Sequence, residues 1–277
     1  MMSELAVVGG DLRMVKLIEM LAKDERKVYT YSLENAEVIK QQKNIQKLEN
    51  IEELKDFDVI IGGVPFSSNG VQINNPFSNA NIDVEELFKN IKGKTLIAGN
   101  IQTKIEELAK LFDIKVIDLL KREELAILNT ISTAEGAIQI AMSETSKTVH
   151  GSNVLVMGFG RIGKILAKML NGIGACVYCE ARKNEDLAWI KAYGYSPVKL
   201  QELDQNLNQF DIIINTIPAI ILKEKQLQRL NKECIMIDIA SLPGGVDKEA
   251  AKKLRNTIYI CFVITSARWL QQLLRNL

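Results

Sequence analysis

The sequence predicts an α/β protein built from two doubly wound domains with parallel sheets, joined by an inter-domain helix. Short apolar runs alternate with amphipathic stretches along both halves of the chain, which is typical of strands connected by helices. A length of 277 residues suits two domains of ordinary size. The hydrophobic content of 47% and the charged content of 25% are those of a globular protein.

The first half alternates candidate strands with candidate helices, and we assign residues 1–128 to an N-terminal domain. The predicted strands are Leu5–Val8, Lys27–Tyr31, Val59–Ile61, Thr95–Ala98 and Lys115–Ile117. The predicted helices are Leu12–Ala22, Val84–Asn90 and Ile101–Leu111. Residues 64–80 form a long loop rich in Asn, Ser, Gly and Pro. Because long loops in compact domains are often functional, this one is a candidate for the substrate cleft, the alternative being a surface excursion.

Gly9 and Gly10 follow the first strand and resemble the start of a dinucleotide fingerprint. The later glycine of that fingerprint is missing, and Asp11 places a negative charge where a phosphate would sit. Asp11 suits instead the N-cap of the helix that follows. We therefore expect the first domain to hold no cofactor of its own.

The second half repeats the alternation after a connecting helix predicted at Ile131–Ser146. Apolar residues recur along one side of that helix, at Ala134, Ala137, Ile138 and Ala141. The predicted strands are Val154–Met157, Ala175–Cys179, Asp211–Asn215, Cys234–Asp238 and Ile258–Val263.

The most informative segment is the glycine loop, Gly158–Gly163, which reads G-x-G-x-x-G between a strand and a helix. Gly158 permits a tight turn, Gly160 lets the backbone approach a pyrophosphate, and Gly163 lets the helix pack closely on the strand. The N-terminus of the helix directs free N–H groups at the phosphates. The predicted contacts are Gly158, Phe159, Gly160, Arg161, Ile162 and Gly163.

This motif assigns different roles to the two domains. Residues 129–277 would combine the linker helix with an NAD(P)-binding Rossmann domain, whereas residues 1–128 would form a flavodoxin- or Rossmann-like substrate domain.

Residues 180–183 should decide which nicotinamide cofactor binds. An acid at the end of the second strand accepts hydrogen bonds from the ribose of NAD, and Glu180 stands there. Arg182 and Lys183 follow at once and could pair with the 2′-phosphate of NADP, or simply begin a solvated helix. A carboxylate beside the 2′-phosphate would repel it. If Glu180 turned outward, Arg182 and Lys183 could bind that phosphate. The sequence favours NADP, with NAD as the alternative, and predicts contacts from Glu180, Ala181, Arg182 and Lys183.

Two further loops follow strands of the same sheet. Ligands of open α/β sheets bind at the carboxyl ends of the strands, so both loops should face the cofactor. The predicted contacts are Thr216, Ile217, Pro218, Ile239, Ala240 and Ser241.

Catalytic candidates are few. His150 could act as a general base, but it precedes its strand at the end opposite the glycine loop, which favours a structural role. Thr133 and Glu135 lie near the start of the connecting helix, where a carboxylate could accept a proton or merely favour the helix N-terminus. No nucleophilic triad and no P-loop is found in the sequence, so hydride transfer, with the cofactor carrying the difficult step, is the simplest chemistry.

Composition excludes several other classes of function. A net charge of +1, with acids and bases interspersed, indicates neither a nucleic-acid nor a membrane-surface partner. The longest apolar run, Ile212–Leu222, is too short to cross a bilayer, and no leader pattern precedes the first strand, so we expect a cytoplasmic protein. Cys176 and Cys179 spell C-x-x-C, but residues three apart in a strand point to opposite faces. With one histidine in the chain, no metal site is expected.

Several segments together carry a more specific resemblance, which covers about residues 4 to 257. They are Val7–Arg13, Arg122–Ile138, Thr148–Asn153, the glycine loop, Glu180–Lys183, Asn215–Ala219 and Asp238–Gly245. These segments resemble the A subunit of bacterial dipicolinate synthase.

The resemblance implies a sporulation enzyme of the mother-cell cytoplasm. It would be an NAD(P)-dependent oxidoreductase that converts a dihydrodipicolinate-type intermediate of the lysine pathway into dipicolinate, pyridine-2,6-dicarboxylate. The family works with a second, flavoprotein-like subunit, and self-association is left open. A substrate with two carboxylates needs donors, for which Arg13 and Asn129, with Thr133, are candidates by position.

The chain also departs from the family. Ser132 stands where proline is common, which should loosen the start of the connecting helix, and Glu180 replaces a small residue. After about Thr257 the family's glycine- and proline-containing segment is absent, although Leu270, Leu273, Leu274 and Leu277 would share one helical face. If the missing segment closes over the cofactor or the substrate, activity would be weakened or lost.

Two alternatives stay open. A relative of the 2-hydroxyacid dehydrogenases would share both doubly wound domains, but it would need a histidine–acid pair late in the chain, and no histidine follows His150. A cofactor-binding partner subunit with little catalysis of its own would also fit, since no general base is obvious.

Overall fold

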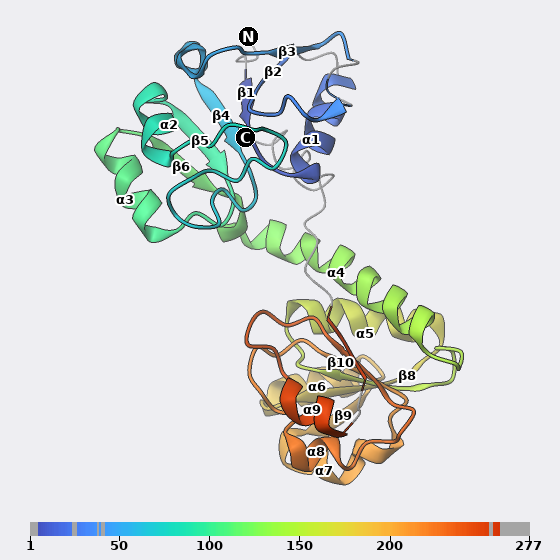
Figure 1. The fold of residues 1–277 in the computed structure, drawn as a ribbon. Coiled ribbons are helices and arrows are strands. Elements are labelled where there is room, and N and C mark those ends of the chain that lie inside the picture. Colours follow the sequence, from blue (N-terminus) through green and yellow to red (C-terminus); the bar gives the residue numbers. More distant parts are fainter. Residues whose placement is uncertain (1–4, 24–26, 38, 40–41, 255–256, 261–277) are drawn as a thin grey trace. The chain divides into compact units, whose positions relative to one another are not determined.

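The computed structural model describes residues 5–23, 27–37, 39, 42–254 and 257–260. The chain divides between Ala126 and Ile127 into two compact units, each built around a parallel sheet (Figure 1). The tail leucines 270–277 and the end of the strand predicted at Ile258–Val263 lie outside the described residues.

The first unit contains a sheet with the strand order β3-β2-β1-β4-β5-β6. Every neighbouring pair is parallel. The strands are β1 (Leu5–Val8), β2 (Val28–Tyr31), β3 (Ile45–Lys47), β4 (Val59–Gly62), β5 (Thr95–Ala98) and β6 (Lys115–Asp118). The helices are α1 (Leu12–Lys23), α2 (Val84–Asn90) and α3 (Thr103–Leu111), with the short 3-10 helices η2 (Ile51–Asp56) and η3 (Leu119–Lys121). The sheet is covered on both faces, because α1 packs in one hydrophobic cluster and α2 and α3 pack in another.

The second unit repeats this topology with the strand order β12-β11-β10-β7-β8-β9. Its strands are also parallel throughout: β7 (Asn153–Met157), β8 (Cys176–Ala181), β9 (Ser196–Lys199), β10 (Ile212–Asn215), β11 (Ile235–Asp238) and β12 (Ile258–Ile260). One face is covered by α4 (Glu123–Glu144), α5 (Arg161–Ile173) and α6 (Asn184–Ala192). The other is covered by η4 (Leu200–Glu202), α7 (Leu203–Asn206), η5 (Leu207–Gln209), α8 (Glu224–Leu227) and α9 (Lys248–Leu254).

Both sheets therefore have the strand order of a dinucleotide-binding Rossmann fold, 3-2-1-4-5-6 counted within each unit. This confirms the predicted fold class of two doubly wound, parallel α/β domains.

Helix α4 begins earlier than predicted, at Glu123 rather than Ile131. Its Ala134, Ala137 and Ala141 are fully buried in the core of the second unit. Within the described ranges, α4 is long and apolar enough to cross a membrane, with a mean hydropathy of 1.2, but this packing is that of a core helix. Ser132 lies well inside α4, where its hydroxyl donates to the Asn129 carbonyl at 3.2 Å, so it does not mark the start of the helix.

The strands β3 and β9 were not predicted from the sequence. Each is the third strand of its unit and lies at an edge of its sheet. β3 has no buried residue, and β9 buries only Val198 and contains Pro197, which an edge strand tolerates. An exposed edge strand shows little apolar periodicity, so its sequence gives a weak signal.

Candidate functional site

The glycine loop of the second unit forms a bend between β7 and α5. Gly158 has a φ of +89°, and a Cβ there would lie 2.6 Å from Thr216 Oγ1. A Cβ on Gly163 would overlap the carbonyl oxygen of Gly158, so this glycine allows α5 to approach the end of β7. Gly160, the N-cap of α5, faces open space instead. The loop thus has a closed inner side and an open outer side, as a diphosphate-binding turn requires.

A cavity of about 490 Å³ opens beside this loop. Its walls come from the carboxyl ends of β7, β8 and β10, the edge at which ligands of open α/β sheets bind. It is lined by Gly158, Phe159, Gly160, Glu180, Ala181, Arg182, Lys183, Asp186, Thr216, Ile217 and Pro218. The structure therefore brings together segments of three predicted loops, and it adds Asp186, which the sequence analysis missed. Its position in the first turn of the helix after the basic pair was the available signal.

Other predicted cofactor contacts lie outside the cavity lining. Arg161, Ile162 and Gly163 form the first turn of α5, where the N–H groups have no helical carbonyl to bond. Ile239 is 1% exposed and belongs to the hydrophobic core. Ala240 and Ser241 follow β11, one strand beyond the cavity wall.

Glu180 is the most unusual residue of the cavity, because this acidic residue is only 1% exposed. Its Oε2 accepts a hydrogen bond from the Gly158 N–H at 3.2 Å, whereas its buried Oε1 has no partner among the described residues. Burial raises the pKa of Glu180, although the Gly158 N–H and the nearby charge of Arg182 act against this. The outward turn considered from the sequence is wrong: the side chain turns inward because the glycine loop offers it a donor.

Arg182 and Lys183 are exposed at the mouth of the cavity. Lys183 is the N-cap residue of α6, and neither cation forms an ion pair with any residue that the structure describes. Both side chains are therefore available to an anionic ligand. Asp186, in the first turn of α6, places a negative charge in the same wall of the cavity.

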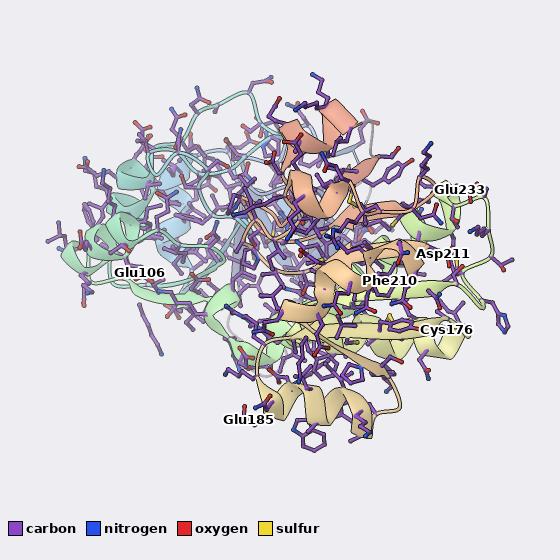
Figure 2. All side chains as sticks on the ribbon, turned by 90° about the horizontal axis from the view of Figure 1, so that it is seen from below. Glu106, Cys176, Glu185, Phe210, Asp211 and Glu233 are labelled. Carbon is purple, nitrogen blue, oxygen red and sulfur yellow. The ribbon has the colours of Figure 1, made fainter. Side chains whose placement is uncertain are left out.

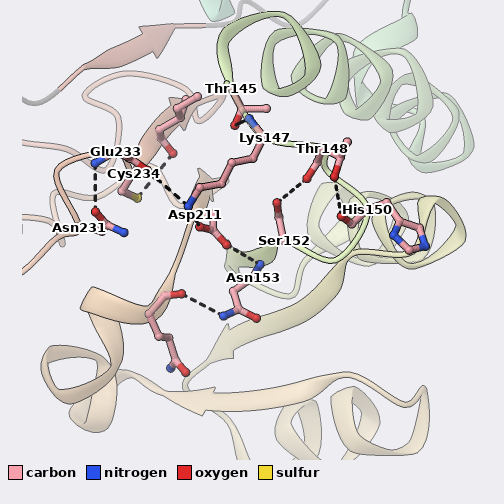
Figure 3. A network of polar contacts seen from close by, with 12 residues as sticks. Thr145, Lys147, Thr148, His150, Ser152, Asn153, Asp211, Asn231, Glu233 and Cys234 are labelled. Atoms are coloured by element: carbon pink, nitrogen blue, oxygen red, sulfur yellow. Dashed lines mark hydrogen bonds and ion pairs between the residues drawn. The ribbon is translucent and has the colours of Figure 1, made fainter.

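His150 lies before the start of β7, at the amino ends of the strands, whereas the glycine loop lies at their carboxyl ends. Its carbonyl accepts a hydrogen bond from Thr148 Oγ1 at 3.0 Å, and its exposed imidazole packs over Gly174 (Figure 3). The length of β7, about 16 Å, separates it from the glycine loop. The structure does not bring His150 to the cavity.

At the same amino ends of the strands, Lys147, which follows α4, forms an ion pair at 2.8 Å with Asp211, which precedes β10 (Figure 3). Burial alone would raise the pKa of Asp211, but hydrogen bonds from Lys147 and from the Asn153 N–H outweigh it and lower that pKa. Figure 2 shows Asp211 together with Glu233 on this side, and Glu185, at the start of α6, away from them.

The candidates on α4 differ in their surroundings. Asn129 is 6% exposed, and its buried Oδ1 lacks a partner among the described residues. Thr133 is buried, and its hydroxyl donates to the Asn129 carbonyl at 3.1 Å. Glu135 is exposed. Asn129 and Glu180 thus carry the buried side-chain atoms without partners in the described part of the chain, and both were singled out as ligand contacts from the sequence.

In the first unit, Arg13 forms an ion pair with Asp11, which directly precedes α1. Its Nη2 lies 2.6 Å from Asp11 Oδ2, and its Nε lies 3.0 Å from both oxygens of the same carboxylate. Asp11 also accepts the Arg13 N–H at 3.0 Å, which confirms that Asp11 is the N-cap of α1.

The loop 64–80 lies over the Gly9–Gly10 turn of the first unit. The Gly10 N–H donates to the Asn74 carbonyl at 2.6 Å, and a Cβ on Gly9 would lie 3.0 Å from the same oxygen. Residues 68–81 also line a polar cavity of about 310 Å³. The chain's own loop therefore already bonds the Gly10 N–H at this turn.

Comparison with known proteins gives two matches to family descriptions. Residues 4–120 match the N-terminal domain of the dipicolinate synthase A subunit, and residues 129–253 match the NAD-binding domain of D-isomer specific 2-hydroxyacid dehydrogenases. The fold and the site thus define an oxidoreductase with a nicotinamide-binding domain.

Similarity over nearly the whole chain is more specific. The dipicolinate synthase A subunit of Bacillus subtilis (strain 168) is 30% identical over 259 residues, which cover 90% of this chain and 84% of the relative. Crystal structures of that protein and of its counterpart from Bacillus halodurans are 29% and 28% identical, each with a TM-score of 0.86. They cover 99% of this chain, and 95% and 97% of the solved chains. The chain belongs to the family of dipicolinate synthase A subunits.

Proposed function

We propose that the chain is an NADP-dependent oxidoreductase subunit that converts a dihydrodipicolinate-type intermediate into dipicolinate. The observation that carries this is the cavity beside the glycine loop, with two exposed cations at its mouth, in a chain of this family. The proposed setting is the mother-cell cytoplasm during sporulation, as the resemblance to this family implies.

The residues of the cavity fit such a cofactor. The open side of Gly160 and the first N–H groups of α5 would hold the diphosphate. Arg182 and Lys183 would bind the 2′-phosphate, since a guanidinium matches phosphate geometry and both cations are available. Glu180 disturbs this less than its charge suggests, because its carboxyl lies beneath the loop and burial raises its pKa. When bound, the nicotinamide supplies hydride acceptance.

Substrate recognition calls for donors that meet two carboxylates. The buried amide of Asn129 is one candidate, and Thr133 positions it through the Asn129 carbonyl. Arg13 is the other, with a guanidinium that Asp11 holds in place from one side. Glu135, exposed on the same helix, is the proposed proton acceptor, whereas the position of His150 supports a structural role.

A second subunit belongs to the proposal, because the relatives are named as one subunit of a synthase. We propose the flavoprotein-like subunit as that partner. The residues after Thr257 depart from the family pattern, so turnover lower than that of the Bacillus subtilis relative is expected.

The test is nicotinamide reduction by the full chain together with its partner subunit. With freshly generated dihydrodipicolinate, the absorbance of reduced nicotinamide should rise. The Arg182→Ala variant should raise the KM for NADP about tenfold and leave the KM for NAD unchanged, because one charge-assisted contact is lost. Lys191→Ala, at the far end of α6 and outside the cavity, is the matched control.

Each outcome has a distinct meaning. A flat trace from a wild-type chain that binds nucleotide would favour the non-catalytic partner subunit. Equal KM values for NADP in the wild type and in Arg182→Ala would remove the arginine from the phosphate site.

A further inference from the structure

Two buried polar side chains lie beneath the loops that follow β10 and β11. Asn215 is the last residue of β10, Asp238 is the last residue of β11, and the two are direct partners in the parallel register. They are 1% and 3% exposed, and neither lines the cavity. Asn215 Nδ2 donates to Asp238 Oδ1 at 2.9 Å. We call these residues the Asn215–Asp238 pair.

The remaining atoms of the pair hold the main chain of both loops. Asn215 Nδ2 also donates to the Ile217 carbonyl at 3.0 Å, and its Oδ1 accepts the Ile217 N–H at 3.2 Å. Asp238 Oδ1 accepts the Ala240 N–H at 3.2 Å, and Oδ2 accepts the Gly245 N–H at 2.9 Å. Since buried polar groups are costly unless they are bonded, the pair fixes both loops to each other.

Glycines allow the second loop to close over the pair. A Cβ on Gly244 would lie 2.5 Å from Asp238 Oδ2, and one on Gly245 would overlap the Asn215 amide. The Gly245 carbonyl then accepts the N–H groups of Ile221 and Leu222, at 2.9 and 3.0 Å. The two loops are therefore joined by side chains and by main chain.

The pair reaches the cavity through Ile217. Ile217 and Thr216 line the wall opposite the basic residues, and a Cβ on Gly158 would lie 2.8 Å from Ile217 Cγ1. A shift of Ile217 would thus press on the glycine loop or leave it without support. We propose that Asp238 and Asn215 are positioning residues, which set the 216–218 loop against the glycine loop before the nucleotide binds. This inference rests on the proposed nucleotide site.

The test compares NADPH binding by full-length variants, followed by fluorescence titration, with thermal melting of the same samples. Asp238→Asn directs an NH₂ group at an N–H donor, so at least one loop is released, and the dissociation constant should rise about tenfold. Asp211→Asn is the matched control, because it also removes a carboxylate that accepts a backbone N–H, but at the amino edge of the same sheet. It should lower the melting temperature and leave NADPH affinity unchanged.

Asn215→Ala keeps the bonds of Asp238 to Ala240 and Gly245 and serves if Asp238→Asn does not fold. Asn215→Ala should also weaken NADPH binding. The double variant should lose less affinity than the two single losses combined, because both substitutions act through the same Asn215–Asp238 pair. Wild-type affinity in Asp238→Asn or Asn215→Ala, or an equal loss in Asp211→Asn, would overturn the inference. Failure of the wild-type chain to bind NADPH or NADH would instead overturn the proposed function and this inference with it.

Discussion

Glu180 shows how one side chain can carry two opposed signals. By position it resembles the ribose-binding acid of NAD enzymes, whereas the residues that follow it suit the 2′-phosphate of NADP. The sequence could not show where the carboxyl points, because this depends on the Gly158 N–H, a donor in the loop that follows the neighbouring strand β7. Its inward position places a buried carboxyl against the glycine loop, while Arg182 and Lys183 stay exposed.

The raised pKa of Glu180 predicts that Glu180→Gln stabilises the protein near neutral pH. In the folded state this pKa lies above its ordinary value of 4.5, so the stability associated with Glu180 is fully present below pH 4.5 and is lost as the pH rises through the folded pKa. Glutamine removes that loss, and the melting temperature should rise by a few degrees at pH 7 but not at pH 4. Melting curves at both pH values check this, with Glu185→Gln, exposed in α6, as the control. An equal rise in melting temperature at pH 4 and pH 7 would contradict the idea that ionisation of Glu180 destabilises the folded protein.

At the scale of elements, the glycine loop and its flanking strand and helix were predictable because each glycine has a local geometric reason. The start of α4 was placed too late, at Ile131 instead of Glu123. Asn129 and Thr130 are weak helix formers, and they interrupted the pattern although residues 123–128 suit a helix. In the structure the Thr130 hydroxyl donates to the Ile127 carbonyl at 2.6 Å and the helix continues through both residues.

Two glycines of α5 should respond in opposite ways to alanine. Gly163→Ala would overlap the Gly158 carbonyl, so it should destabilise the protein by about 2 kcal/mol and abolish nucleotide binding. Gly172→Ala meets no atom within 4 Å and should stabilise the protein by up to about 1 kcal/mol, since glycine is a poor helix former. Chemical denaturation and NADPH titration measure both effects. Nucleotide binding by Gly163→Ala at wild-type affinity would contradict the proposed packing of α5.

At the scale of the whole molecule, the same sheet topology occurs in both units, but different groups lie at the carboxyl ends of the strands. In the second unit the carboxyl ends of the strands hold a cavity with two exposed cations, whereas in the first unit the loop 64–80 bonds to Gly10. From Asp11 and the missing glycine, the sequence predicts that the first domain holds no cofactor of its own, and this stays a prediction. The sequence could not show that the Asn74 carbonyl accepts the Gly10 N–H or that Arg13 pairs with Asp11, because such contacts depend on loop geometry.

The most direct measurement is hydrogen exchange of the full chain, read by mass spectrometry with and without saturating NADP. If the dinucleotide binds at the glycine loop, peptides containing Gly158–Gly163 and Thr216–Pro218 should exchange more slowly when NADP is present. Peptides containing Gly9–Arg13 should not change, because the Gly10 N–H is already bonded to Asn74. Protection of Gly9–Arg13, with none at Gly158–Gly163, would place the nucleotide in the other unit and contradict the account.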